Sequence, residues 1–305
     1  MDDINKLASV HLGKAGDGSV VKPYVTPDNI DPTLLVPVPR HLNRTQYGID
    51  DNDLPFVGYD TWNCYEFSTL TNNGFPVSGV IRIVYAAHTP NIVESKSLKL
   101  YLNSFNMHKS GATIQDVIEF IEEKIETDLF GIDVHCSACF HDETAIVTQP
   151  IIGDFLTLEN FCDVETMSFD HYNEDPAILE VVDNPDYIDA WKSHSLRSNC
   201  RVTNQPDWGD VYIYIEGDKT ITPESLLQYI VSMRKENHFH EEICECIYKR
   251  LLDTLNPDEL MVACLYTRRG GIDINPVRAK GVGSLIKFAQ NLIQPDFLNY
   301  KTMRQ

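Results

Sequence analysis

The chain has 305 residues, of which 43% are hydrophobic, and it is long enough for one large domain or two modest ones. Its 45 acidic and 25 basic residues give a formal net charge of -20. This charge argues against a nucleic-acid partner, because phosphate backbones are bound by clustered lysines and arginines. No run of about eighteen apolar residues occurs, so we expect no membrane contact and a cytoplasmic location.

The cysteines are expected to be free thiols, because eight of them at irregular spacings do not suggest a disulfide framework. Cys136 and Cys139, flanked by His135 and His141, have the spacing of half a zinc site. No second pair matches them, and the alternation of residues over 134–140 is typical of a strand. We therefore predict a strand here and no metal site.

The first half of the chain begins with an irregular segment. Residues 1–55 are rich in Pro, Asp and Asn, and we interpret them as an extension wrapped on the body. The β-branched run at 79–85 is typical of a buried strand. A helix is predicted from 97 to about 107, and a second one starts near Thr113, where Thr113 and Asp116 have the spacing of a capping box.

The second half repeats this plan after a connection at 153–191. Thr222 and Pro223 supply the N-cap and the first turn of a helix. The expected elements are a strand at 211–215, helices from 222 to about 235 and from about 241 to 255, and a strand at 261–267. The first helices of the two halves also match residue by residue: Ser97, Leu98, Tyr101, Leu102, Ser104 and Phe105 correspond to Ser225, Leu226, Tyr229, Ile230, Ser232 and Met233.

This repeat predicts an α+β protein made of two tandem modules, 56–165 and 166–305. Each module supplies strands and paired helices in the order ββαα followed by ββ, and the short hairpin connections favour antiparallel sheets. One module alone would leave open sheet edges, which a second module covers by continuing the sheet. Ligands are then expected at the seam between the modules.

Cys200 and Asp207 form the most informative chemical motif, because they flank a turn that contains Pro206. A thiol becomes nucleophilic when a base or a positive field favours its ionised form, and addition to a polar multiple bond needs an acid to protonate the developing anion. The pair can supply both groups. A buried structural cysteine before a turn is the alternative. Cys64, preceded by Asn63, is a second candidate nucleophile, but no Gln-Pro-Asp run follows it.

Glu94 lies where a predicted strand gives way to a helix. Its carboxylate can accept two N–H bonds from the edge of a guanine-like ring, and Ser95 and Lys96 at the helix start suit a phosphate or a ribose. A helix cap with Lys96 in solvent is the alternative.

A second polar cluster opens the helix near residue 240. His240 can be a hydrogen-bond partner of a heterocycle and Glu241 a second acceptor, and Phe239 can stack on the ring. Metal binding by His238 and His240 is a rival interpretation that lacks a third ligand. Another interpretation makes His238 a surface residue.

Arg269 and Gly270 belong to a turn of two arginines and two glycines that follows a predicted strand. Glycine allows a close backbone approach, and arginine presents a planar fork to phosphate. The turn is therefore the best dinucleotide-phosphate candidate, although no Gly-x-Gly-x-x-Gly fingerprint opens a βαβ unit. A plain arginine-bearing turn is the alternative.

Taken together, these segments resemble the NADPH-dependent 7-cyano-7-deazaguanine reductases, the nitrile reductases of queuosine biosynthesis, in their long two-module form. The resemblance extends from residues 42–44 to residues 273–276, and the run 94–105 is similar to the family signature. It implies the tunnelling fold (T-fold), a barrel-like homo-oligomer that is commonly a dimer, a 7-deazapurine substrate and NADPH as the cofactor.

The resemblance also implies roles for single residues. Cys200 is similar to the nucleophile that forms a thioimide with the nitrile carbon, and Asp207 to the proton donor. The implied substrate contacts are Val93, Glu94, Ser95, His240 and Glu241, to which the stacking argument adds Phe239. The implied NADPH contacts are Ser95, Lys96, Arg269 and Gly270. Hydride would reduce the thioimide and then an imine, so two cofactor molecules would be used per turnover.

Two other classes of protein stay open. An amidine-forming relative of the same fold would form the thioimide but would need no nicotinamide, and Lys96, Arg269 and Gly270 favour the reductase over it. A non-catalytic binder of purines or pterins would use its glutamates to recognise the ring and would leave Cys200 incidental. Such a binder would form no covalent adduct with the nitrile.

Overall fold

The computed structural model describes residues 27–129, 133–140 and 155–293. In these residues the chain is a mixed α+β protein built around an 11-stranded, mainly antiparallel sheet. Among the described helices, none has the length and apolar character that crossing a bilayer requires. His141 of the half zinc motif lies outside the described residues.

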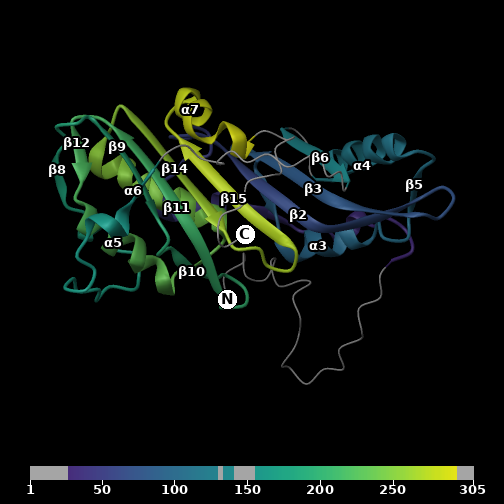
Figure 1. Ribbon diagram of the computed structural model, residues 1–305, viewed down its shortest axis with the longest axis horizontal. Coiled ribbons are helices and arrows are strands. Elements are labelled where there is room, and N and C mark those ends of the chain that lie inside the picture. The colour runs from purple at the N-terminus through teal and green to yellow at the C-terminus, as the bar shows by residue number, and fades with distance from the viewer. Residues whose placement is uncertain (1–26, 130–132, 141–154, 294–305) are drawn as a thin grey trace, which may run out of the picture.

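The two halves of the chain share this sheet. Its main strands are, in spatial order, β13 (Asn237–His238), β10 (Arg197–Cys200), β11 (Pro206–Glu216), β14 (Glu259–Tyr266), β15 (Ile272–Ala279), β2 (Val57–Thr71), β3 (Pro76–Ala86) and β6 (Val134–Phe140). The halves join at the antiparallel pair β15 and β2, in which Ile272 lies opposite Cys64 and Ala279 opposite Val57. Figure 1 shows the resulting twisted band, with β2, β3 and β6 at one end. The predicted continuation of the sheet from one half into the other is confirmed.

Shorter elements complete the scaffold. β9 (Ile188–Ser193) pairs with β11, β7 (Leu156–Thr157) with β9, and β5 (Lys109–Gly111) with β2. Two small sheets pair β8 (Val181–Asp183) with β12 (Lys219–Ile221) and β1 (Pro37–Pro39) with β4 (Asn91–Val93). The short helices are η1 (Pro32–Leu34), α2 (His41–Arg44), η2 (Thr45–Tyr47), η4 (Leu158–Phe161), η5 (Pro176–Ile178) and η6 (Met233–Lys235). The described part of the N-terminal extension thus contains only short elements, and β1 ties it to the strand that leads to Glu94.

The alternation of side chains along the strands decides which helices cover which face. Val211 and Ile213 of β11 pack with α5 (Pro223–Ser232) and α6 (His240–Leu255), whereas Tyr212 packs with α7 (Val282–Ile293) on the opposite face. In the first half, α3 (Ser95–Asn103) and α4 (Ile114–Asp128) cover the face that carries Ile274 of β15. Arg278 has the same parity as Ile274 and reaches α6. The four paired helices therefore share one face of the sheet.

The matched helices α3 and α5 make equivalent contacts. Ser97 and Ser225 each accept a hydrogen bond from a distant backbone N–H, at 3.1 and 3.0 Å. Ser104 and Ser232 each donate to the carbonyl of the tyrosine three residues earlier. Shared sequence therefore has the same structural use in both halves, as a duplication predicts.

Some predicted bounds are corrected. α3 begins at Ser95 and ends at Asn103, earlier at both ends than predicted. It begins at Ser95 because the carboxylate of Glu94 caps the helix by accepting the N–H of Ser97 at 2.7 Å. β11 runs from 206 to 216, well beyond the predicted 211–215, and α7 is a helix that the sequence analysis did not predict. The capping box at Thr113 and the strand over 134–140 are confirmed.

Candidate active site

One cavity, of about 680 Å³ including its mouth, lies at the seam between the two halves of the chain. The predicted site residues that line it are Val93, Glu94, Ser95, Lys96, Cys200, Asp207, Phe239, His240, Glu241 and Arg269. The first four come from the first half of the chain and the others from the second. The cavity therefore brings together predicted residues that lie far apart in the sequence, from Val93 to Arg269.

The turn between β10 and β11 places the thiol and the carboxylate. The N–H of Cys200 donates to the carbonyl of Gln205 at 2.8 Å, and the carbonyl of Cys200 accepts from Asn204 at 3.0 Å. Asn204 has a φ of 54°, a left-handed conformation that asparagine tolerates in tight turns. The chain then returns with Asp207 opposite Ser198. Cys200 is a half-buried free thiol at the end of its strand, whereas Asp207 is buried.

Asp207 is held by two partners on the cavity wall. It forms an ion pair with Arg269, and its Oδ2 lies 3.4 Å from Nε2 of His240. Burial alone would raise the pKa of Asp207, but the hydrogen bond and charge of His240 and the charge of Arg269 hold that pKa below its ordinary value. Asp207 is therefore an ionised carboxylate at neutral pH, and it can accept a proton.

Glu94 serves the local fold and the cavity at once. Its Oε2 caps α3, and its Oε1 accepts a hydrogen bond from the hydroxyl of Ser95 at 3.3 Å. The predicted cap is thus confirmed, but Lys96, which that interpretation placed in solvent, lines the cavity. A carboxylate has about four lone-pair sites, so capping leaves capacity for a ligand in the cavity that Glu94 lines.

Three buried polar atoms on residues of the cavity wall have no hydrogen-bond partner among the described residues: Trp62 Nε1, His240 Nδ1 and Glu241 Oε1. Such atoms are costly unless a ligand or water pairs with them. The imidazole of His240 is fixed by stacking on Tyr266, with ring centroids 3.8 Å apart and planes 5° apart. The wall therefore offers fixed hydrogen-bonding groups that suit a polar heterocycle.

His238 is not a surface residue, and that interpretation of the sequence is wrong. Its Nδ1 lies 3.2 Å from Glu242 and its Nε2 3.3 Å from Glu236. Burial lowers the pKa of His238, but hydrogen bonds to these two carboxylates outweigh burial and raise it to about 9. Glu242 also pairs at 2.7 Å with Arg201, the residue after Cys200. A protonated His238 is a poor metal ligand. It instead anchors the end of β10, the strand that carries the thiol of Cys200.

The turn between β14 and β15 is fastened to both halves of the chain. Arg269 pairs with Asp207, and Nζ of Lys99 on α3 donates to the carbonyl of Gly270 at 2.9 Å. Gly270 and Gly271 have φ values of 58° and 79°, which explains the glycine pair. Gly270 lines a smaller adjoining cavity of about 200 Å³, which shares Lys99 with the larger one.

The donor set on this wall fits an anionic dinucleotide. Lys96, Lys99 and Arg269 place three cationic side chains around one cavity of an acidic protein. Ser95 is the first residue of α3, where backbone N–H groups and the helix dipole also favour phosphate.

Cys64, the alternative nucleophile, has a different environment from Cys200. It lies in the middle of β2, between Ile272 of β15 and Ile81 of β3. Burial, and then the charge of Asp273, raises the pKa of its thiol far above the ordinary value. A thiol in this position stays protonated at neutral pH.

Several residues of the cavity wall were not predicted from the sequence, among them Trp62, Lys99 and Ile274. Trp62 lies directly opposite Ile274 across the junction of β2 and β15, a contact that no local pattern reveals. Lys99 could have been found, because it lies one helical turn after Ser95 in the same signature run.

A half-buried thiol, a carboxylate, unpaired polar atoms and cations lie around one cavity, which is the kind of arrangement found in enzyme active sites. The family model described as "Nitrile reductase, 7-cyano-7-deazaguanine-reductase N-term" matches residues 26–135, and the one described as "QueF-like protein" matches residues 206–282.

Two curated relatives extend these matches over most of the chain. The NADPH-dependent 7-cyano-7-deazaguanine reductase of Colwellia psychrerythraea is 40% identical over 276 residues, which are 86% of this chain and 90% of the relative. The protein of the same name from Dechloromonas aromatica is 40% identical over 255 residues, which are 82% of this chain and 86% of the relative. The chain belongs to the family of NADPH-dependent 7-cyano-7-deazaguanine reductases.

Proposed function

We propose that this protein reduces the nitrile of 7-cyano-7-deazaguanine to an aminomethyl group, in queuosine biosynthesis, with two molecules of NADPH supplying four electrons. One observation carries the proposal. A single cavity combines Cys200, Asp207 and Glu241 from the second half with Glu94 from the first, in a chain 40% identical to reductases of that name.

The first step joins the sulfur of Cys200 to the nitrile carbon. Asp207 starts as a carboxylate, so it accepts the thiol proton and then delivers it to the nitrile nitrogen as one π bond of the triple bond breaks. The product is a thioimide, and no other reactant is consumed. Covalent attachment turns an unreactive triple bond into a C=N group that accepts hydride.

NADPH, when bound, would supply two hydrides, one for the thioimide and one for the imine left when the sulfur of Cys200 departs, and each addition would also take up one proton from solvent. Lys96, Lys99 and Arg269 would hold the phosphates, with Ser95 at the start of α3. The turn at Gly270 would let the backbone approach the cofactor closely. Glu94, His240 and Glu241 would fix the substrate ring, and Phe239 would stack on it.

The direct test mixes purified protein with 7-cyano-7-deazaguanine and NADPH, and follows the absorbance of NADPH together with the mass of the product. We expect two NADPH molecules consumed per aminomethyl base formed. Any other ratio would contradict the mechanism.

Intact-mass measurement with the nitrile alone tests the covalent step. Cys200→Ala should lose the adduct entirely, because the nucleophile is gone. Cys64→Ala is the matched control and should keep the adduct, because the Cys64 thiol is buried within β2. An adduct that survives in Cys200→Ala would show that a residue other than Cys200 attacks the nitrile.

The same measurements separate the rival functions. An amidine-forming enzyme would show the adduct without oxidising NADPH, and a purine or pterin binder would show neither. The three cations on the cavity wall favour the reductase.

The proposal includes two T-fold modules in a barrel-like homodimer located in the cytoplasm. Within the described residues, β6 and β13 at the two ends of the main strand order each pair with one strand only, so the sheet can continue into a second copy. The described cysteines are free thiols, as in proteins of reducing compartments. Light scattering that gives a monomer mass would contradict the assembly.

A further inference from the structure

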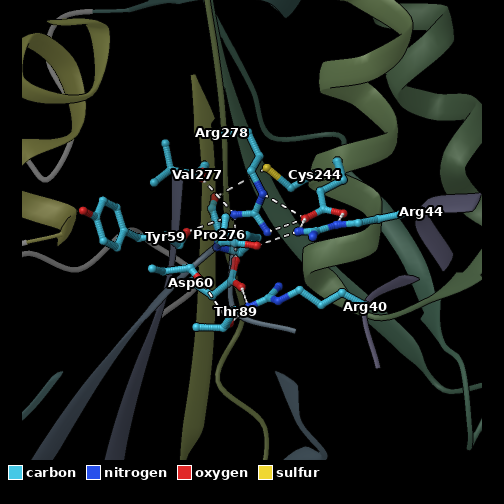
Figure 2. A network of polar contacts seen from close by, with 12 residues as sticks. Arg40, Arg44, Tyr59, Asp60, Thr89, Cys244, Pro276, Val277 and Arg278 are labelled. Carbon is cyan, nitrogen blue, oxygen red and sulfur yellow. Dashed lines mark hydrogen bonds and ion pairs between the residues drawn. The ribbon is translucent and has the colours of Figure 1, made fainter. Parts of the chain in front are cut away.

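A buried cluster of charges lies next to the ligand-binding end of α6, and Figure 2 shows its arginines. Asp60 of β2 pairs with Arg40 of the N-terminal extension at 2.7 Å and with Arg278 of β15 at 2.8 Å. Arg278 also pairs at 2.8 Å with Glu245, which follows Glu241 by one turn of α6. The cluster is completed by Arg44, which pairs with Glu245 and with Asp51, both at 2.7 Å.

The charges of this cluster balance without Glu241. Three guanidinium groups meet three carboxylates, those of Asp51, Asp60 and Glu245. Glu241 is 3% exposed, and its Oε1 has no hydrogen-bond partner among the described residues. A fourth ionised carboxylate would add an uncompensated charge to a buried region, which is strongly unfavourable.

Charged and titratable groups from several elements act on Glu241. They are Arg40 of the extension, Asp60 of β2, Tyr85 of β3, Arg278 of β15 and Glu245 of α6 itself. Both arginines are already paired with carboxylates. Burial, and then the negative charge of Asp60, raises the pKa of Glu241 to about 8.

We propose that Asp60, which does not line the cavity, is a positioning residue that keeps Glu241 a neutral carboxylic acid, so that Glu241 donates a hydrogen bond to the substrate ring. This inference deepens the proposed function and rests on it. The edge of a deazaguanine ring carries N–H donors and a carbonyl acceptor. Glu94 accepts hydrogen bonds from the N–H groups of the ring, and the protonated carboxyl group of Glu241 donates a hydrogen bond to the ring carbonyl oxygen. An ionised Glu241 would repel the ring carbonyl oxygen.

Affinity for the substrate ring should then decrease as the pH rises. The neutral form of Glu241 prevails below about pH 8 and is lost as the pH rises through that value. Above it, affinity should fall by about tenfold per pH unit. In Asp60→Asn the negative charge is gone and Arg40 and Arg278 can turn to Glu241, so the fall in affinity should begin at least about one pH unit lower.

The first test needs no ligand. Infrared spectroscopy at neutral pH should show a protonated-carboxyl band in the unmodified protein and lose it in Glu241→Gln. Absence of that band from the unmodified protein would overturn the inference, even if Asp60→Asn fails to fold.

The second test measures affinity for 7-cyano-7-deazaguanine by calorimetry across neutral and alkaline pH, in the Cys200→Ala background to prevent the covalent step. Asp60→Asn should move the alkaline fall in affinity to lower pH, and Glu241→Gln should abolish it. A purely structural role for Asp60 would weaken binding at all pH values and leave the position of the fall unchanged, which would refute the inference.

Asp51→Asn is the matched control for Asp60→Asn. It removes a carboxylate from the same cluster, but neither Asp51 nor its partner Arg44, which keeps its pair with Glu245, is among the groups that shift the pKa of Glu241. The fall in affinity should stay near pH 8 in this variant. If the base does not bind at any pH, the proposed function itself fails, and the infrared result still decides the state of Glu241.

Discussion

Asp207 is ionised in this structure, although the resemblance assigns it the role of proton donor. The two statements agree if Asp207 first takes the proton of Cys200 and then delivers it to the nitrile nitrogen. Arg269 is central to this cycle because it pairs with Asp207 and is also a proposed cofactor contact. A single side chain thus connects the proton-transfer group to the wall that would bind phosphate.

Replacing Arg269 by Gln should raise the pKa of Asp207, because a neighbouring cation stabilises the carboxylate. A carboxylate with a lowered pKa keeps its base function above that pKa and loses it as the pH falls through it. The acidic limit of adduct formation should therefore move to higher pH in Arg269→Gln. The rate of adduct formation without NADPH measures this and avoids any effect on cofactor binding.

Arg268→Gln is the control at the neighbouring position. The guanidinium of Arg268 lies over the ring of Tyr65, 4.2 Å from its centroid, and is not among the main causes of the shifted pKa of Asp207. The acidic limit of adduct formation in Arg268→Gln should match that of the unmodified protein. Equal shifts in both variants would mean that Asp207 responds to the general charge of the turn and not to Arg269.

Local patterns predicted the helices and strands well, and their limits have physical causes. The capping box at Thr113 and the strand over 134–140 follow from neighbouring residues alone. The true start of α3 depends on which side chain caps it, and the long Glu94 side chain does so in place of a serine or threonine. His238 looked like a surface residue because its partner Tyr47 lies 191 positions away.

The cluster around His238 should make stability depend on pH. The pKa of His238 is raised from 6.5 to about 9, so its contribution is fully present below pH 6.5 and is lost as the pH rises to 9. The free energy of unfolding should fall over this range by on the order of 3 kcal/mol more in the unmodified protein than in His238→Gln. Urea unfolding at the two pH values measures the difference.

His171→Gln serves as the control for this prediction. His171 is an exposed histidine whose Nδ1 lies 3.9 Å from Asp175, and such a surface pair contributes little. The free energy of unfolding of His171→Gln should fall between the two pH values by as much as that of the unmodified protein. If His238→Gln behaves in the same way, the charged state of His238 does not stabilise the start of α6.

At the scale of the whole molecule, the likeness of α3 and α5 was readable from sequence, but the seam between the two halves was not. Matching serines, leucines and tyrosines in α3 and α5 reveal the repeat, because both copies bury the same face. Which strand of one half meets which strand of the other is set by long-range pairing, and the Trp62 and Ile274 contact shows this directly. The candidate site residues that line the cavity each lay in a recognisable motif, whereas the wall residues between the motifs could not be predicted.

The ion pairs that cross the seam between the two halves predict how the molecule unfolds. Arg278 of β15 pairs with Asp60 of β2 and with Glu245 of α6, so it joins the two halves beneath the sheet, and its side chain is fully buried. Removing it leaves two buried carboxylates without this partner, which should cost about 3–5 kcal/mol of unfolding free energy in Arg278→Met. Urea unfolding followed by tryptophan fluorescence and by circular dichroism measures this loss.

Arg250→Met gives the comparison, because Arg250 also pairs with a carboxylate, Glu174 at 3.0 Å, but lies within the second half and is partly exposed. Its loss should cost only about 1 kcal/mol. Because the sheet is continuous across the seam, both probes should report one coincident transition in the unmodified protein. Separate transitions would show that the two halves fold independently, in which case the cavity between them would be lost at the first of the two transitions.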